Sequence, residues 1–222
     1  KRPVDGGKKM VEIGALIADG KILAPGPEFV GTRATHVTVD QPRAYRVGPA
    51  GQEGEHPKAV SVKCKPTGQA GATDIAVRYH VYLKLPEPLE AGASCTIAFP
   101  GVNTNVESVT YTHKPREVRS EAIHATQLGY RPSDPFKRAY LSLWTGTGGG
   151  VSYPDVRRFE LLDEGGKTVY AGEVVLGFPA DRAESIRGGR NHNKTDVYYL
   201  DFHEFDTPGT YRVHVPGIGV SF

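Results

Sequence analysis

The sequence predicts an all-β protein built from two tandem β-sandwich domains. Short runs of alternating or β-branched residues recur along the 222 residues, with turn residues between them. The 27 Gly and 17 Pro indicate many turns, whereas long apolar helical stripes are few. A strand–turn–strand phrase also occurs twice, at residues 81–101 and 198–217. A repeat at this spacing indicates two similar modules.

The two copies of this phrase share their order of features. In each copy a Tyr-Leu pair ends a strand-like run, and a Gly follows the Tyr by ten residues, at Tyr82 and Gly92 and again at Tyr199 and Gly209. An alternating strand then closes on Pro-Gly in both copies. The phrase therefore predicts the same β architecture twice.

The second copy contains the elements of a tyrosine corner. Pro208 and Gly209 turn the chain, and Tyr211 opens the next strand. In such a corner the ring tucks under the preceding turn and its hydroxyl bonds the backbone there. Alternation places Tyr211 on one face of the strand and His214 on the other. The first copy has Cys95 near the equivalent place, so we expect the corner to be lost or altered there.

The order of strands and breakers places a domain boundary where the apolar pattern lapses, at residues 114–117, giving domains 1–117 and 118–222. Between strands, residues 66–68 are expected to break the chain, and residues 145–150 and 178–194 to form long surface loops, with a short helix within 180–186 as an alternative. Strands are expected at residues 10–15, 36–39, 44–47, 59–64, 75–85, 94–99, 108–112, 122–126, 138–144, 158–162, 168–176, 197–202, 210–215 and 219–222.

Composition excludes two classes of partner. The 27 basic and 25 acidic residues give a formal charge of +2, too balanced for a nucleic-acid-binding surface. No apolar run approaches the ~18 residues of a membrane span. No signal-peptide apolar region opens the chain, which leaves export open. Cys64 and Cys95 either form one disulfide or remain two buried thiols, and the sequence leaves both readings open.

The second half contains a series of short segments in a characteristic order. They are Ala-Ile-His-Ala-Thr-Gln-Leu-Gly-Tyr-Arg-Pro at 122–132, Lys-Arg-Ala-Tyr-Leu-Ser at 137–142, Phe-Glu-Leu-Leu-Asp at 159–163, Gly-Lys-Thr-Val-Tyr-Ala-Gly at 166–172, Leu-Asp-Phe at 200–202 and Pro-Gly-Thr-Tyr at 208–211. In this order they resemble the immunoglobulin-like domain that precedes the catalytic domain in many family-nine glycoside hydrolases, which are cellulases and related β-glucan-degrading enzymes. The resemblance covers about residues 120–222 and implies two tandem immunoglobulin-like β-sandwich domains, the first only loosely similar.

The resemblance implies a structural role rather than catalysis. In that family a helical barrel after this domain carries the catalytic Asp pair, commonly within Asp-Ala-Gly-Asp, and the acid Glu, and this sequence has no Asp-Ala-Gly-Asp. We therefore expect a non-catalytic accessory pair of modules, without cofactor, that packs against and stabilises a catalytic glycoside hydrolase domain in cis. Gln127, Leu128 and Tyr130 are the candidate contacts with that domain, and Trp144 is a further candidate. The family also implies a secreted, periplasmic or cell-surface protein.

Two other functions remain open at this point. An autonomous module for plant polysaccharide needs exposed aromatic rings on which pyranose faces stack, and Trp144, Tyr153 and Tyr198 are the candidates. Because Tyr198 and Tyr199 are adjacent, one of them should face out of its strand. A protein-interaction or adhesion module is the third reading, since sandwiches serve many functions.

Residues typical of catalysis or metal binding occur without the required spacing. Asp201, Glu204 and Asp206 cluster near the tyrosine corner, where solvated turn residues are expected. The eight His residues form no compact ligand motif, and His203 and His214 are expected to face solvent. No Gly-x-Ser-x-Gly occurs, and the Gly-rich run at 146–150 lacks the Lys-Ser/Thr of a phosphate-binding loop. We expect no metal site.

Overall fold

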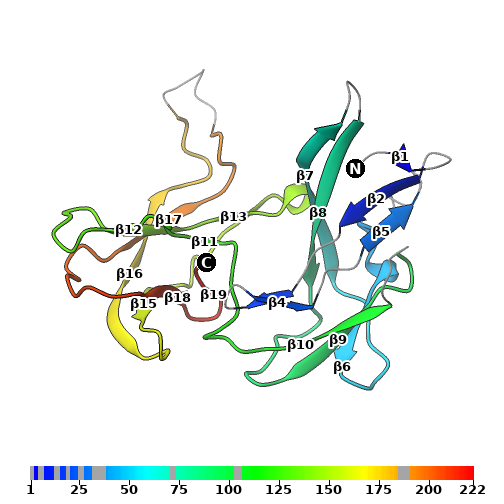
Figure 1. Cartoon of the computed structure of the whole chain (residues 1–222), viewed down its shortest axis with the longest axis horizontal. Coiled ribbons are helices and arrows are strands. Elements are labelled where there is room, and N and C mark those ends of the chain that lie inside the picture. The colour runs from blue at the N-terminus through cyan, green and yellow to red at the C-terminus, as the bar shows by residue number, and fades with distance from the viewer. Residues whose placement is uncertain are drawn as a thin grey trace. The chain divides into compact units, whose positions relative to one another are not determined.

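The computed structural model describes residues 3–4, 8–12, 16–18, 21–24, 28–31, 39–70, 74–102, 107–184 and 191–222. Within these residues the protein is nearly all β, as the sequence predicts (Figure 1). None of the described residues belongs to a helix long and apolar enough to cross a membrane. The chain divides into two compact units. The first includes Lys21–His113 and Thr145–Gly148, and the second includes Lys114–Trp144 and Gly149–Phe222.

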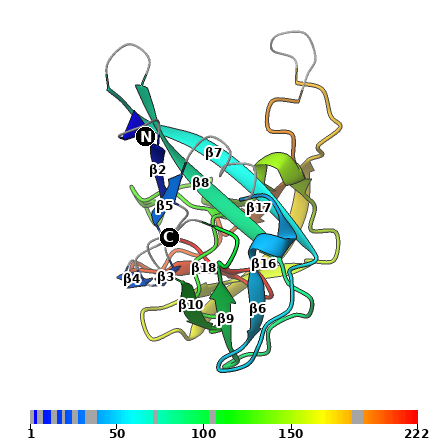
Figure 2. The same cartoon turned by 90° about the vertical axis from the view of Figure 1, so that its right-hand side faces the viewer.

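The first unit contains a five-stranded and a three-stranded sheet. In the larger sheet the strand order is β1-β2-β8-β7, with β5 also paired to β2, and in the smaller it is β10-β9-β6. Figure 2 shows β7 and β8 as a long adjacent pair. The strands are β1 (Pro3–Val4), β2 (Lys8–Glu12), β3 (Leu16–Ala18), β4 (Lys21–Ala24), β5 (Glu28–Gly31), β6 (Arg46–Pro49), β7 (Ala59–Ala70), β8 (Asp74–Lys84), β9 (Ser94–Ala98) and β10 (Ser108–Thr112), and a 3-10 helix spans Pro42–Ala44 (η2).

The core of this unit is centred on Tyr45, which is 1% exposed. Its ring packs edge-on against Phe99, with the ring centroids 6.2 Å apart. Its hydroxyl donates a 2.6 Å hydrogen bond to the carbonyl of Val39 six residues earlier. Burial raises the pKa of this hydroxyl far above its ordinary value. A buried tyrosine that bonds upstream backbone is thus present in this unit too, directly before β6 and outside the repeated phrase.

The predicted break at residues 66–68 is wrong. Strand β7 continues through Pro66 and Gly68 to Ala70, with a shift of register against β8 between Pro66 and Gly68. A bulge leaves one residue out of the ladder, so a proline without a backbone N–H is accommodated and the strand goes on. Of the strands predicted at 10–15 and 36–39, residues 13–15 and 36–38 lie outside the described residues.

A Gly-rich turn, residues 145–148, packs on the edge strand β7 in this unit. It contains the 3-10 helix Gly146–Gly148 (η3). The amide of Val62 donates a 2.9 Å hydrogen bond to the hydroxyl of Thr147. A Cβ on Gly146 would overlap the carbonyl oxygen of Val62 and lie 2.7 Å from the Cα of Lys63. The predicted long loop is therefore an ordered cap on a strand that has a free edge.

We expect Gly146→Ala to displace this turn from β7. Both Gly146 (φ 73°) and Gly149 (φ 75°) have left-handed backbone, but a Cβ on Gly149 meets no atom within 4 Å. Gly149→Ala therefore measures the backbone penalty alone, and Gly146→Ala should cost about 2 kcal/mol more because it also forces a steric overlap. Amide exchange of Val62 checks this. Equal protection of that amide in both variants would contradict the packing.

The second unit has one path of seven strands, β11-β12-β17-β16-β15-β18-β19 (Figure 1). Strand β16 changes partner along its length: its first half pairs with β15 and its second half, from Val174 to Phe178, pairs with β17. A separate pair, β13 with β14, completes the unit. The strands are β11 (Ile123–His124), β12 (Arg138–Leu141), β13 (Leu143–Trp144), β14 (Gly150–Val151), β15 (Arg158–Leu162), β16 (Thr168–Phe178), β17 (Val197–Asp201), β18 (Arg212–Val215) and β19 (Gly219–Val220).

Side chains from both stretches of this path meet in one apolar core. Leu141 on β12, Phe159 on β15 and Leu200 on β17 are each 0% exposed. Partly buried Tyr130 and Phe205 pack against this core from the connecting segments. The alternative of a helix within 180–186 is not seen in residues 180–184, which form a turn and coil, and residues 185–186 lie outside the described residues.

Candidate functional site

The chain between β17 and β18 forms a tyrosine corner. The hydroxyl of Tyr211 donates a 3.2 Å hydrogen bond to the carbonyl of Pro208. Its ring lies over Gly209, where a Cβ would come within 2.8 Å of the ring carbon Cζ. Phe205 packs edge-on against the other side of the corner, with ring centroids 4.9 Å apart at 88°. The absence of a side chain at Gly209 therefore allows the ring to fold back onto the turn.

A tight turn at Thr126–Gly129 presents an apolar side chain to solvent. The amide of Leu128 donates a 3.2 Å hydrogen bond to the hydroxyl of Thr126, and Gly129 supplies the left-handed backbone (φ 81°). Leu128 is 98% exposed, and Phe136 is 80% exposed. Single exposed apolar residues are common on protein surfaces. A leucine held at the tip of a hydrogen-bonded turn contributes little to its own domain.

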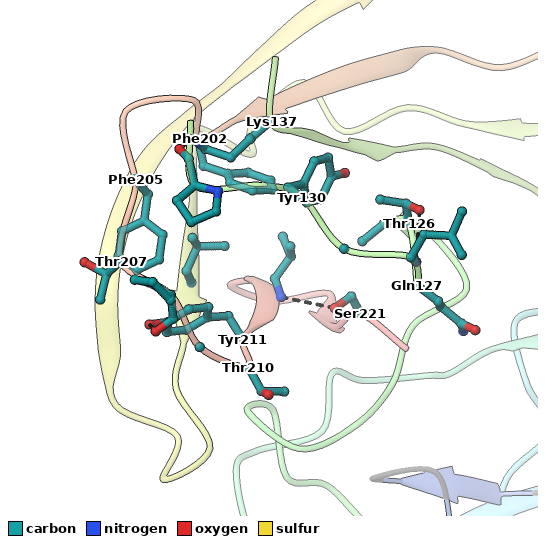
Figure 3. Close-up of a pocket in the computed structure, with 18 of the residues that line it drawn as sticks. Thr126, Gln127, Tyr130, Lys137, Phe202, Phe205, Thr207, Thr210, Tyr211 and Ser221 are labelled. Carbon is teal, nitrogen blue, oxygen red and sulfur yellow. Dashed lines mark hydrogen bonds between the residues drawn. The ribbon is translucent and has the colours of Figure 1, made fainter. Parts of the chain in front are cut away.

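A cavity of about 480 Å³ opens between this turn and the tyrosine corner. In Figure 3, Phe205, Thr207 and Tyr211 stand on one side of it and Thr126 and Gln127 on the opposite side. Apolar side chains line its floor and walls, and Leu128 and Phe222, which is 48% exposed, also line it. The apolar side chains among the lining residues are Ala125, Leu128, Tyr130, Pro132, Leu161, Phe202, Phe205, Pro208, Tyr211, Val213 and Phe222.

Several polar groups of the lining are bonded within the domain. The ammonium group of Lys137, a residue only 4% exposed, donates to the carbonyls of Pro132 at 2.5 Å and Asp134 at 3.2 Å. The hydroxyl of Tyr130 donates to the carbonyl of Arg138 at 2.5 Å, and burial raises the pKa of that hydroxyl. These groups are therefore engaged within the domain, whereas Gln127, Thr207 and Thr210 add polar side chains to the apolar lining.

Residues 118–220 match the family model described as the cellulase N-terminal ig-like domain. This segment, called the Ig-like domain below, is similar to that family over just under half of the chain. The search of curated proteins and the search of solved structures gave no match. The match spans nearly all of the second unit and includes the turn, the cavity and the tyrosine corner. The matched family is a non-catalytic part of cellulases.

Two of the three residues predicted to contact a neighbouring domain lie at the surface of the Ig-like domain. Gln127 and Leu128 are exposed on the turn, whereas Tyr130 is half-buried with its ring edge-on to Phe202 at 5.2 Å. All three line the cavity. Sequence reasoning missed Phe136 and Phe222. A signal existed for Phe136, because it is an apolar residue directly after the turn-forming Ser-Asp-Pro at 133–135.

The aromatic candidates for sugar stacking do not form a row. Trp144 is 41% exposed on β13. Tyr153 is half-buried and packs edge-on against Tyr198, with centroids 6.0 Å apart. Tyr198 was the wrong choice of the adjacent pair: it is 5% exposed, and its hydroxyl accepts the amide of Tyr153 at 2.9 Å and donates to Asp196 at 3.3 Å. The outward residue is Tyr199, because its register partner on β12 is the exposed Tyr140.

Other side chains of the same domain pack against the ring of Tyr199. The guanidinium of Arg138 stacks 4.4 Å from its ring centroid, and a Cβ on Gly177 would overlap the ring. The ring of Tyr140 stands at 81° to it. Arg138 is in turn held by Asp201 at 2.6 Å. Burial would raise the pKa of Asp201, but the hydrogen bonds from Arg138 and His203 lower it to about 2. The rings thus form no flat platform.

The expectation that His214 faces solvent is wrong. Both His214 (4% exposed) and Glu160 (6%) are buried, and they are register partners on β18 and β15. Their side chains bond each other at 3.0 Å, and Arg116 bonds the same carboxylate at 2.9 Å. The prediction from the alternation of side chains along the strand required one face of β18 to be solvated. Arg116, 44 residues from Glu160 in sequence, instead covers that face. His203 is exposed and bonds Asp201.

The other candidate groups show no assembled site. Cys95 is a free, buried thiol whose pKa is raised by burial, and the side chain of Cys64 lies outside the described part of the structure. Glu204 and Asp206 are exposed, as expected for turn residues. Over the part of the chain that the structure describes, no three His, Cys, Asp or Glu residues lie together as a metal site requires.

Proposed function

We propose that this protein is the non-catalytic front part of a family-nine-like, polysaccharide-degrading glycoside hydrolase, and that its Ig-like domain packs against the catalytic domain. The observation that carries this proposal is the match of residues 118–220 to the cellulase N-terminal ig-like domain. A β-glucan polymer is too large to be degraded inside a cell, so the protein is proposed to act after secretion, in the periplasm or at the cell surface.

The surface proposed for this packing is the cavity with its rim. Leu128 and Phe222 are exposed apolar side chains on that rim. Polar groups beside them, such as Lys137, are bonded internally. An apolar side chain from a catalytic domain would bury these surfaces without leaving the ammonium group of Lys137 unpaired, and polar groups of that domain would face Gln127, Thr207 and Thr210. The proposed contact residues are therefore Gln127, Leu128 and Tyr130, as the sequence suggested, together with Phe222.

Two measurements test this function. The purified chain is expected to release no reducing sugar from carboxymethylcellulose, mixed-linkage glucan or xylan, and turnover by the pure chain contradicts the proposal. A family-nine catalytic barrel fused after Phe222 is expected to unfold at a higher temperature than the barrel alone, because an apolar interface stabilises both partners. Equal unfolding temperatures for the barrel alone and in the fusion contradict the packing role.

In this fusion Leu128→Ser should remove about 2 kcal/mol of the stabilisation, the value of burying one leucine side chain. In the chain without a barrel the same change should have an effect within about 0.5 kcal/mol, because Leu128 is 98% exposed. Leu176→Ser is the matched control: Leu176 is 46% exposed and does not line the cavity. The measurement is thermal unfolding of fusion and isolated chain. Equal effects of both variants in the fusion would contradict the proposed surface.

An autonomous glycan-binding role is the second proposal, favoured by one observation. Trp144 is the sole tryptophan and is 41% exposed. Affinity electrophoresis on cellulose derivatives, xylan and mixed-linkage glucan tests it: if the role is correct, retardation is expected and Trp144→Ala should abolish most of it, because a stacked ring contributes about 1–2 kcal/mol. Tyr140→Ala serves as the comparison, since Tyr140 is equally exposed but perpendicular to its neighbour. No retardation on any glycan would contradict this role.

A further inference from the structure

Residues 116–120, the segment that leads into the Ig-like domain, are attached to that domain at two places. The first unit includes residues up to His113, and the segment follows directly. The amide of Ser120 donates to the carbonyl of Val220 at 2.9 Å, and the amide of Val220 donates to the carbonyl of Val118 at 2.9 Å. Arg119 thereby forms a parallel bridge with Val220. The last strand of the domain therefore holds residues 118–120 by backbone hydrogen bonds.

Arg116 makes the second attachment. Its guanidinium donates to the carboxylate oxygen Oε2 of Glu160 at 2.9 Å, to the hydroxyl of Thr168 at 2.8 Å and to the carbonyl of Gly166 at 3.1 Å. The fork of the guanidinium thus bridges β15, β16 and the turn between them. The attachment depends on the negative charge of Glu160, because the other two acceptors are neutral.

The same oxygen of Glu160 is shared by other donors. His214 Nδ1 lies 3.0 Å from Oε2, and the hydroxyl of Thr168 donates to it at 3.2 Å. The other carboxylate oxygen, Oε1, accepts from Arg158 at 3.2 Å. Burial would raise the pKa of Glu160, but the bonds from His214, Arg116 and Thr168 outweigh it, and the pKa is lowered. The carboxylate therefore stays charged and is the common acceptor of the cluster.

His214 is the side chain of this cluster whose ordinary pKa lies closest to neutral. Its Nε2 is buried without a partner at hydrogen-bond distance, although the carbonyl of Pro115 lies near the ring. Burial and the positive charge of Arg116 disfavour the imidazolium, whereas Glu160 and the carbonyl of Pro115 favour it, and the net effect lowers the pKa. On β19 its register partner is the apolar Val220. The imidazole is therefore neutral at pH 7 and places no second buried cation beside Arg116.

Acidification changes this balance. When His214 is protonated, its imidazolium and the guanidinium of Arg116 both lie against the same carboxylate oxygen of Glu160, Oε2. Arg158 lies against the other oxygen, Oε1. His214 and Glu160 belong to paired strands, and their side chains are 5% and 8% exposed, so neither leaves without disrupting the sheet. The side chain of Arg116 is 43% exposed and lies outside the sheet, so it is the cation that turns into water at the least cost.

We propose that Glu160, His214 and Arg116 form an acid-sensitive clasp, in which protonation of His214 displaces Arg116 from Glu160 and loosens residues 116–120 from the Ig-like domain. This goes beyond the structural role proposed above, because it makes attachment of the segment between the units depend on pH. The step is a single proton uptake at His214 with no covalent change.

Amide exchange of the whole chain at pH 7.5, 6.5, 5.5 and 5.0, corrected for intrinsic exchange rates, tests the clasp. Protection of the amides of Ser120 and Val220, which form the two hydrogen bonds between the segment and the domain, is expected to fall by up to about tenfold for each pH unit below the pKa of His214, as a single titrating group allows. The amides of Leu161 on β15 and Leu200 on β17, two strands that are paired on both sides, should keep their protection. Equal loss at all four amides would show unfolding of the domain as a whole and overturn the proposal.

Two variants and a control complete the test. His214→Gln keeps an N–H donor for Glu160 but does not titrate, so the pH response of the Ser120 and Val220 amides should vanish. Arg116→Gln should lower their protection already at pH 7.5 and flatten the response. His203→Gln, at an exposed histidine paired with Asp201, should leave the response unchanged. A wild-type response that persists in His214→Gln, or protection that is flat with pH in the wild type, overturns the clasp.

Discussion

Phe159→Ala is expected to destabilise the Ig-like domain by about 4 kcal/mol, the usual cost of emptying a buried phenylalanine site. The ring is 0% exposed and stands between strands that belong to different parts of the sheet path. Its centroid lies 6.2 Å from that of Tyr170 on β16 and 6.5 Å from that of Phe202 after β17. Urea unfolding followed by the fluorescence of Trp144, the only tryptophan and a residue of this unit, measures the loss.

The neighbouring Gly172 shows how closely this ring is packed. A Cβ at Gly172 would lie 2.6 Å from Cε1 and 2.8 Å from Cζ of Phe159. Gly172→Ala alone should therefore cost about 2 kcal/mol through overpacking, and much of this cost should disappear in the Phe159→Leu background, where the ring atoms are gone. Val169→Ala, at a 39% exposed position on the same strand, is the control and should change stability by less than about 0.5 kcal/mol. Additive costs at Gly172 and Phe159 would contradict this packing.

The strands of the second unit were predictable from sequence because each carries its own pattern. Residues 158–162 and 197–202 were expected as strands, and β15 and β17 occupy Arg158–Leu162 and Val197–Asp201. The repeated phrase also has a structural counterpart: β8 and β9 belong to different sheets, and β17 and β18 do not pair with each other. In both copies the middle Gly, Gly92 or Gly209, thus lies in chain that leaves one set of strands for another, whereas the closing Pro-Gly lies between two paired strands, β9 and β10 or β18 and β19.

Features that depend on distant parts of the chain were not predictable. Pro66 reads locally as a strand end, but pairing of β7 with β8 on both sides of it carries the strand past. A Gly-rich run reads as a free loop, whereas Gly146 is required by the close approach of β7. Local patterns describe the conformational preferences of a segment, and these outcomes were decided by partners far away in sequence.

The same limit applies to the candidate sites. Adjacent Tyr198 and Tyr199 are chemically alike, and only the register with β12 shows which one faces out. The cavity arises from segments about 80 residues apart, the turn at Thr126–Gly129 and the corner at Tyr211, which no spacing rule connects. The turn itself was found, because Gln127, Leu128 and Tyr130 lie in the segment that carries the family resemblance.

Glu160→Gln is the second change for which a large loss is expected, about 3 kcal/mol, the lower end of the range for breaking a buried ion pair. The amide retains the shape of the carboxylate but removes the charge that holds Arg116 at 2.9 Å and Arg158 at 3.2 Å. It also leaves the buried His214 beside a group that is half donor. The loss is expected to be at this lower end because Arg116 regains water when it is released, its side chain being 43% exposed.

The pH dependence of the free energy of unfolding shows whether the charge of Glu160 causes this loss. Because the pKa of Glu160 is lower in the folded domain than in the unfolded chain, its contribution is complete above its ordinary value of 4.5 and is lost as the pH falls through the folded value. His214 acts in the same direction at higher pH: its lowered pKa means that the unfolded chain takes up the proton first, so stability falls as the pH drops below 6.5. Glu160→Gln should therefore lie furthest below wild type at pH 7 and approach it near pH 3.

Glu164→Gln, one of the exposed residues of the turn between β15 and β16, controls for the loss of one negative charge from the domain and should be neutral within about 0.5 kcal/mol. In the double variant with Arg116→Gln, the loss should be smaller than the sum of the two single losses, because the unpaired guanidinium is gone. Urea unfolding across pH 3–8 measures the wild type and all four variants. A loss in Glu160→Gln that is constant over that range would mean that shape, not charge, sets the cost, and the cluster would then be a packing feature rather than an electrostatic one.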